Sequence, residues 1–118
     1  MKQINIDPQK WQHLPGYRRN ILLTGADLHS PGTRVQMVSM APGDSISDHY
    51  HKTSYEVYCV LKGQCTLIVD GQEIILRPRT LITIEPGDIH QLHNHGHETF
   101  ELLVFKTNSQ PDDTLFDS

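Results

Sequence analysis

Cysteine is scarce in this sequence, and the two cysteines present form no recognisable motif. Cys59 and Cys65 are not spaced as a C-x-x-C pair, and a Lys62-Gly63 turn separates them. Two cysteines in 118 residues cannot make the disulfide framework of a small secreted domain. We expect two ordinary small side chains in neighbouring strands.

Long apolar runs and a surplus of positive charge are also missing. No run approaches the roughly 20 apolar residues of a membrane-spanning helix, and residues 1–11 lack the apolar core of a signal peptide. The formal net charge is −4, whereas a general nucleic-acid binder normally carries a basic surplus. These absences predict a cytoplasmic protein whose partner is neither a membrane nor a nucleic acid.

The sequence also lacks helical periodicity. Its patterns are instead those of β-strands. Asp70-Gly71 lies between two apolar runs, which is a strong hairpin signal because both turn positions need a positive φ. The predicted strands cover residues 20–24, 34–40, 55–61, 65–69, 72–76, 81–84, 89–93 and 99–105. Short strands separated by frequent glycine and proline turns are typical of an all-β sandwich or barrel.

The length of 118 residues fits a single domain. We expect residues 1–33 to be an N-terminal extension of that domain with one short strand. Residues 34–106 should form its core. Residues 107–118, which are acidic, should be a solvated tail.

Histidine is frequent between residues 49 and 97, where six of the eight histidines lie. His49 and His51 are two residues apart, so on an extended backbone their side chains point to the same face, with Cα atoms about 6.6 Å apart. Two imidazoles at this spacing can converge on one ion at about 2.1 Å per bond. Taken alone, the pair is more typical of two polar residues near a strand end.

Two further residues favour a metal site. Glu56 should share a strand face with Tyr58 and Val60, where an unpaired carboxylate is costly to bury and a cation would remove that cost. His90 follows the Pro86-Gly87-Asp88 turn and can approach from a different strand. We therefore expect one divalent metal ion held by four ligands: His49, His51, Glu56 and His90.

The spacing of the first three ligands resembles the first motif of the cupin superfamily at every defined position. The residues that carry this resemblance are Gly43, His49, His51, Glu56 and Gly63. Residues 85–94, with the Pro86-Gly87 turn, His90 and Asn94, resemble the second motif. Arg79 and Glu85 depart from that motif, which usually has glycine and often has proline at these positions.

The resemblance spans residues 34–105 and implies a small single-domain cupin, a jelly-roll β-barrel with a metal at its mouth. The same four residues would be the ligands. Three imidazoles and one carboxylate suit Mn, Fe, Co, Ni, Cu or Zn, and the donor set does not choose among them. Similar proteins usually form homodimers, and the strand over 55–61 is apolar on both faces.

The resemblance leaves two functions open. One is a metalloenzyme, an isomerase, lyase, decarboxylase or dioxygenase, acting on an oxygen-rich anionic metabolite such as a sugar or keto acid. The other is a sensor module that binds a small ligand without turning it over. A purely structural metal site fits less well, because such sites are usually closed and rich in cysteine.

For several other polar residues the sequence allows both a functional and a purely structural interpretation. Tyr58 is a candidate catalytic residue on the face of Glu56, and a packed core tyrosine is the alternative. The alternating histidines after His90 either shuttle protons or lie in a hydrated loop: His93, His95 and His97. Three arginines either clamp an anionic substrate or are solvated strand ends: Arg34, Arg77 and Arg79.

Overall fold

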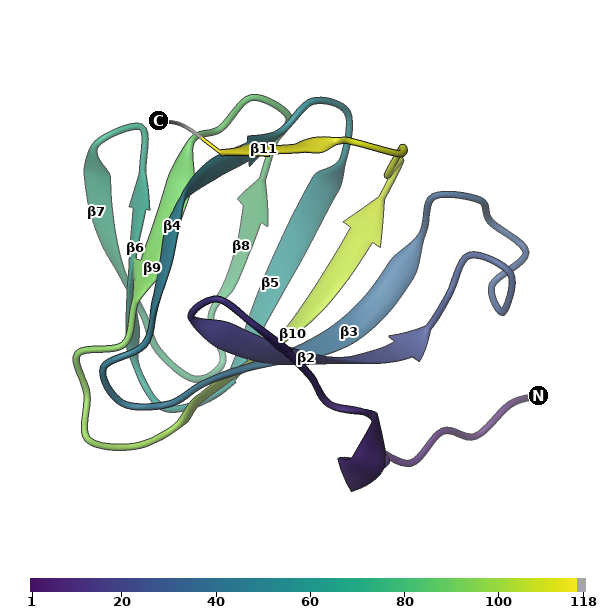
Figure 1. Cartoon of the computed structure of the whole chain (residues 1–118), viewed down its shortest axis with the longest axis horizontal. Helices are drawn as coiled ribbons and strands as arrows, with labels where there is room; N and C mark the ends of the chain where they lie inside the picture. The colour runs from purple at the N-terminus through teal and green to yellow at the C-terminus, as the bar shows by residue number, and fades with distance from the viewer. Residues whose placement is uncertain (117–118) are drawn as a thin grey trace.

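Two antiparallel sheets face each other in the computed structural model, which describes residues 1–116 (Figure 1). The six-stranded sheet has the order β1-β2-β3-β10-β5-β8, and its strands are β1 Gln12–Leu14, β2 Tyr17–Leu23, β3 Arg34–Met40, β10 Phe100–Thr107, β5 Tyr55–Lys62 and β8 Leu81–Ile84. The five-stranded sheet has the order β11-β4-β9-β6-β7, and its strands are β11 Thr114–Phe116, β4 Ser45–His51, β9 His90–His93, β6 Cys65–Val69 and β7 Gln72–Leu76. The all-β jelly roll is confirmed, as two facing sheets.

The hydrophobic core fills the space between the two sheets. Strand alternation sends every second side chain inward, so β10 contributes Phe100, Leu102 and Val104 from one sheet. Leu67 of β6 and Leu92 of β9 meet them from the other sheet. The cysteines are free, with Cys65 buried in the core and Cys59 partly exposed; their strands, β5 and β6, are consecutive in the chain but lie in different sheets.

The β6–β7 hairpin agrees with the sequence prediction. Val69 pairs with Gln72, and the turn between them has positive φ at both Asp70 (47°) and Gly71 (82°). Most other predicted strands are present within one to three residues of the expected bounds. The only helix among residues 1–116 is η1, Pro8–Lys10, so the described chain has no helix long enough to span a membrane.

Strand β4 is missing from the sequence prediction because its sequence, SISDHYH, is mostly polar. The parity argument for its histidines nevertheless holds. His49 and His51 are both buried on the inner face, whereas Tyr50 between them is partly exposed. Strand β4 pairs with β9 on one side and with β11 on the other.

Residues 113–116 belong to the segment expected to be a solvated tail; Thr114 and Phe116 are exposed, but the segment is ordered and pairs with the sandwich. Thr114–Phe116 form β11, which pairs with the His49–His51 end of β4 and crosses the top of the molecule in Figure 1. Asp113 is buried, and its carboxylate accepts hydrogen bonds from the backbone N–H groups of Thr53 (2.7 Å) and Ser54 (3.2 Å). The acidic residue thus anchors the segment, because it satisfies donors at the β4–β5 turn. Asp117, also assigned to the tail, lies outside the described residues.

Candidate metal centre

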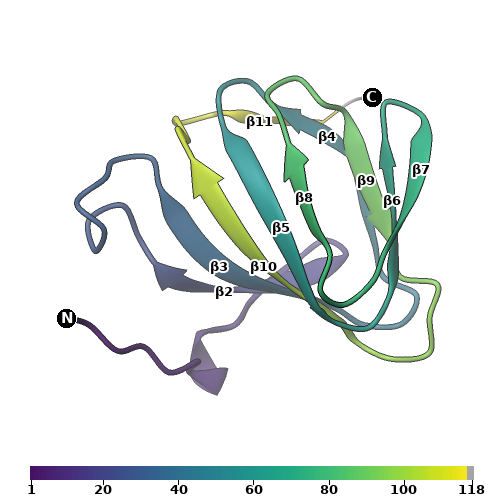
Figure 2. The same cartoon turned by 180° about the vertical axis from the view of Figure 1, so that it is seen from behind.

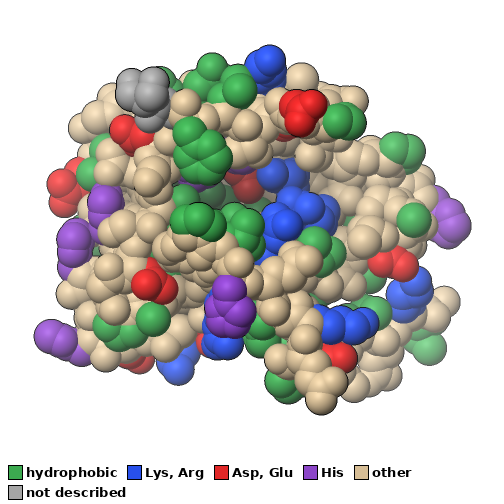
Figure 3. All heavy atoms as spheres, in the orientation of Figure 1, with side chains coloured by type: hydrophobic (Ala, Val, Ile, Leu, Met, Phe, Trp, Pro, Cys, Tyr) green, Lys and Arg blue, Asp and Glu red, His purple; other side chains and the backbone are tan. Residues whose placement is uncertain are grey.

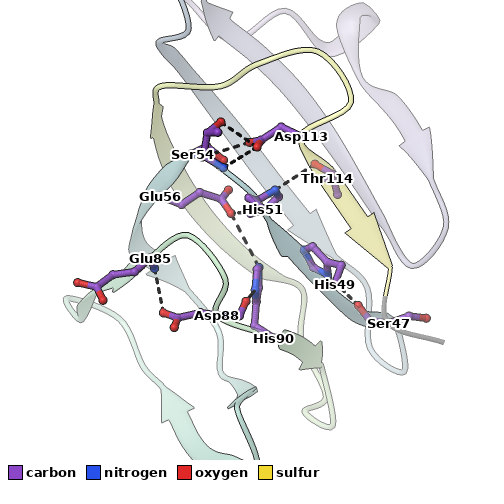
Figure 4. A network of polar contacts seen from close by, with 11 residues as sticks. Ser47, His49, His51, Ser54, Glu56, Glu85, Asp88, His90, Asp113 and Thr114 are labelled. Carbon is purple, nitrogen blue, oxygen red and sulfur yellow. Dashed lines mark hydrogen bonds and ion pairs between the residues drawn. The ribbon is translucent and has the colours of Figure 1, made fainter.

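Four side chains from three strands converge at one end of the sandwich (Figure 4). β4 supplies His49 and His51, β5 supplies Glu56, and β9 supplies His90. Each histidine offers a nitrogen, and the three nitrogens lie within 4.8 Å of one another. His90 is the direct cross-strand partner of His49, which explains why the two imidazoles meet with ring centroids 4.1 Å apart. Three histidines are therefore positioned to hold a metal ion.

Backbone carbonyls fix which ring nitrogen of two of these histidines carries the proton. Nδ1 of His49 lies 2.8 Å from the carbonyl of Ser47, and Nδ1 of His90 lies 2.8 Å from the carbonyl of Asp88. A carbonyl oxygen only accepts, so each Nδ1 donates, and in the neutral ring Nε2 keeps its lone pair. This is the arrangement in which a second partner orients a metal-binding imidazole.

Glu56 brings a buried carboxylate against the histidines. Its Oε1 lies 2.6 Å from Nε2 of His51 and 3.8 Å from Nε2 of His90. None of these three atoms has a hydrogen bond of acceptable geometry. Glu56 and His51 contact each other closely, but buried polar atoms without well-formed hydrogen bonds are costly, and a cation among these atoms would remove that cost. Two ligands at right angles on one ion, each at about 2.1 Å, would be about 3.0 Å apart, so the donor set fits a bound transition metal.

The electrostatics of the site keep its ligands in metal-binding form. Burial, with the nearby His49, lowers the pKa of His90 to about 4, and burial lowers the pKa of His49 as well. Burial alone would raise the pKa of Glu56, but the close contact with His51 and the charge of Lys106 bring it below its ordinary value. At neutral pH the imidazoles of His49 and His90 are therefore neutral, and the carboxylate of Glu56 is ionised.

The centre opens into a cavity of about 220 Å³ between the sheets. His49, His51 and Glu56 line the cavity, while His90 lies fully buried beside them. Tyr58 lines it as well, and its hydroxyl stays protonated because burial, and then the charge of Glu56, raise its pKa well above the ordinary value. Tyr58 can donate a hydrogen bond into the cavity.

Residues that the sequence did not single out complete the site. Oγ1 of Thr114 lies 3.0 Å from Nδ1 of His51, and the ring of Phe116 lies 5.8 Å from that of His49. Both belong to β11, whose only sequence signal is a short Thr-Leu-Phe run after two aspartates. Lys106 also lines the cavity. Its signal is a lysine that continues the inward alternation of Phe100, Leu102 and Val104.

Of the remaining candidate residues, one lines the cavity and the others lie outside it. Arg34 lines the cavity, whereas Arg77 and Arg79 are exposed and do not. His93 faces away from the centre and lies within hydrogen-bond distance of Ser45 and Gln91. His95 and His97 are exposed in the β9–β10 loop, at the opposite end of the sandwich from β11 (Figure 1). The hydrated-loop interpretation fits these two histidines.

The structure is a two-sheet jelly roll in which three inward histidines on the neighbouring strands β4 and β9 face Glu56 on the other sheet. The chain belongs to the cupin family, since the family model described as "Cupin domain" matches residues 36–106. Asn94 of the second motif supports the β9–β10 loop, because its buried side chain donates to the carbonyls of Met40 and Glu98.

Known relatives carry several different activities. The chain is 36% identical over 87 residues to quercetin 2,3-dioxygenase of Bacillus subtilis, an alignment that covers 66% of this chain but only 26% of that protein. It is 21% identical over 108 residues to the oxalate-binding protein of Thermotoga maritima, covering 88% and 89%. Among solved structures, the polyketide cyclase RemF of Streptomyces resistomycificus superimposes with a TM-score of 0.82 at 22% identity, covering 100% of this chain and 87% of that one.

Proposed function

We propose that this chain binds one divalent transition-metal ion through His49, His51, Glu56 and His90, and acts as a metalloenzyme on a small oxygen-rich anion. The observation that carries the proposal is the convergence of three buried imidazoles and the Glu56 carboxylate beside an open cavity, with no hydrogen bond of acceptable geometry at Nε2 of His51, Nε2 of His90 or Oε1 of Glu56. The named activities of the relatives support the class and not the reaction.

The charge of the centre favours an anionic ligand. Three neutral imidazoles and one carboxylate would leave a divalent ion with a net charge of about +1, and the sheltered cavity weakens its attraction for an anion less than bulk water would. A bound ion would supply Lewis-acid stabilisation of an oxygen that gains negative charge. Tyr58 would donate a hydrogen bond to the same ligand, which is how we assign its catalytic role.

A ligand-binding sensor without turnover is the second candidate, and one observation favours it. The two tyrosines that line the cavity, Tyr17 and Tyr58, both have pKa values raised by burial, so neither is a base near neutral pH. A reaction that begins with proton abstraction would need another group. Decarboxylation and oxygenation make no such demand, so they fit the cavity better than isomerisation or β-elimination.

The test is elemental analysis followed by a metabolite screen. Purified protein should carry close to one transition-metal ion per chain, and the His49→Ala/His51→Ala variant should carry almost none. The exposed pair provides the control, because His95→Ala/His97→Ala should keep the metal. Full metal content in the first variant would overturn the assignment of the site.

The screen separates the enzyme from the sensor. Metal-loaded protein is offered sugars, keto acids and uronates, and turnover of one of them should disappear with the metal. Glu56→Gln should keep the fold while it weakens metal binding and turnover together. Tight binding of one compound without any metal-dependent turnover would replace the enzyme with the sensor.

A further inference from the structure

The wall of the cavity beside the metal centre is strongly basic. Three cations line the cavity, Arg19, Arg34 and Lys106, whereas Glu56 is the one carboxylate among the described lining residues. Figure 3 shows Lys and Arg side chains gathered at the centre of this face, beside the hollow between the sheets. The whole chain has a net charge of −4, so this concentration of positive charge runs against the overall balance.

The strand register places two of these cations in one row with the proposed metal ligand. Arg34 of β3 pairs with Lys106 of β10, and Lys106 pairs in turn with Glu56 of β5. Directly paired residues point to the same face of a sheet, and neighbouring strands lie about 4.8 Å apart. The row therefore runs across the inner face from the metal centre to the two cations.

These cations lack the partners that a structural role would supply. Lys106 is only 7% exposed, yet neither Lys106 nor Arg34 forms an ion pair within the described chain. The Nε atom of Arg34 and the Oε1 atom of Gln36, both buried at the same wall, have no hydrogen-bond partner. Burying a cation without a partner is costly, and apolar side chains would fill the space at lower cost.

Neighbouring charges add to that cost. Burial, followed by the charge of Arg19, lowers the pKa of the Arg34 guanidinium. Burial also lowers the pKa of Lys106, an effect that Glu56 partly opposes. A metal ion bound by Glu56 would neutralise the negative charge of that carboxylate. Asp113 would then be the remaining carboxylate that acts on Lys106, and it does not line the cavity, so an anionic ligand would supply the counter-charge inside the cavity.

We infer that Arg34 and Lys106, assisted by Arg19, form an anion-binding subsite that takes the second carboxylate of a small dicarboxylate. This inference rests on the proposed function for the first carboxylate, which the metal centre would hold. A guanidinium matches the geometry of a carboxylate, and Lys106 adds a point charge. The unpaired Oε1 of Gln36 can accept from a hydroxyl on the connecting carbons.

The size of the cavity restricts the dicarboxylate to short chains. A volume of about 220 Å³ lies below the roughly 300–1,000 Å³ of sites for drug-sized ligands. The row from Glu56 to Arg34 crosses two strand spacings of about 4.8 Å each, so the two carboxylates should be separated by only a few carbons. Malonate, succinate and glutarate are therefore suitable probes.

The experiment measures binding of these diacids and of propionate, a monoacid, by isothermal titration to protein loaded with one equivalent of Ni²⁺. At least one diacid should bind tenfold or more tightly than propionate. Arg34→Gln and Lys106→Met should each reduce that preference to about twofold or less without loss of metal. Arg77→Gln removes one positive charge outside the cavity and should leave the preference unchanged.

Two results would overturn the subsite. One is equal affinity of the wild type for propionate and for all three diacids, a comparison that holds even if the variants do not fold. The other is wild-type preference in folded Arg34→Gln and Lys106→Met proteins. Metal-free protein separates the two proposals. If no metal binds but succinate still shifts the amide resonances of residues 34 and 106, the subsite stands and the metal function fails.

Discussion

Nδ1 of His51 lies 3.0 Å from Oγ1 of Thr114, a residue 63 positions later in the chain. The contact ties the C-terminal strand β11 to the proposed metal centre, because the threonine oxygen can accept the Nδ1 proton and leave Nε2 free for a metal. It completes a pattern in which His49 and His90 donate through Nδ1 to backbone carbonyls. Only the partner of His51 is a side chain, so it alone can be removed by substitution.

Thr114→Val should therefore weaken metal binding without removing it. Loss of an outer partner of a metal-bound histidine typically costs about 10- to 100-fold in affinity, and the lower value is expected here because the β4–β11 pairing stays in place. Competition with a chelator measures the change. Thr83→Val on exposed strand β8 is the matched control and should have no effect. Unchanged affinity in Thr114→Val would remove the role assigned to Thr114.

The metal-free protein should lose stability as the pH falls from about 6.5 to about 4. The pKa of His90 is lowered from 6.5 to about 4 in the folded state, so the unfolded chain binds more protons across this range. Stability is then fully present above pH 6.5 and falls by up to about 3 kcal/mol toward pH 4. The lowered pKa values of His49 and Glu56 act in the same direction.

Urea unfolding of the metal-free protein at several pH values measures this loss. His90→Gln should flatten the dependence, whereas His97→Gln, at an exposed histidine, should leave it unchanged. A free energy of unfolding that is constant between pH 7 and pH 5 would contradict the prediction.

Arg79→Gly should stabilise the protein. Arg79 has a φ of 73°, in the left-handed region that costs a residue with a Cβ about 1–2 kcal/mol, and glycine adopts it freely. Part of this gain is lost to the greater entropy of glycine in the unfolded chain, so the net increase should be about 0.5–1 kcal/mol. Thermal unfolding measures it, with Arg77→Gly as a control that should destabilise. A lower melting temperature for Arg79→Gly would contradict the argument.

The outer face of the six-stranded sheet should pair two chains into a homodimer. β5, β8 and β10 face the viewer in Figure 2 with no other described segment across them. Outward alternation puts a band of apolar side chains there, from Leu81 (66% exposed) to Phe105 (41% exposed). The other members of the band are Tyr55, Val57, Cys59, Leu61 and Leu103. Exposed apolar patches of this kind commonly mark association surfaces.

Sedimentation at micromolar concentration should give about 27 kDa, twice the chain mass of 13.5 kDa. Phe105→Glu should shift the mass to that of one chain. Leu28→Glu, at an exposed apolar residue outside the face, should not. A wild-type mass near 13.5 kDa would refute the dimer.

Local sequence patterns predicted most of the strands and the shared face of two proposed metal ligands. The Asp70-Gly71 turn, the alternation of β5 and the shared face of His49 and His51 depend on neighbouring residues, so they can be read in sequence. Strand β11 was not predicted, because its only signal, a run of three residues after an acidic pair, is too short to indicate a strand. Their place depends on β4, more than sixty residues earlier.

The basic wall of the cavity could not be predicted either, because it also depends on residues that are far apart in the sequence. Lys106 and Glu56 are fifty residues apart, and nothing in either segment indicates that they are direct cross-strand partners. Arg34, Arg77 and Arg79 are equivalent candidates in the sequence. Only the fold distinguishes them, because it turns Arg34 into the cavity and leaves the other two in solvent.

The position of β10 has a consequence for how the chain is made in the cell. β10 lies between β3 and β5, yet it is synthesised roughly 40 residues after β5 ends. At about 5–20 residues per second, β3 and β5 emerge from the ribosome several seconds before the strand that joins them. During that interval both carry unpaired hydrogen-bonding edges, and the equivalent strand of a neighbouring nascent chain can occupy the gap. Slower translation between residues 63 and 99 would lengthen this exposure and favour strand-exchanged aggregates.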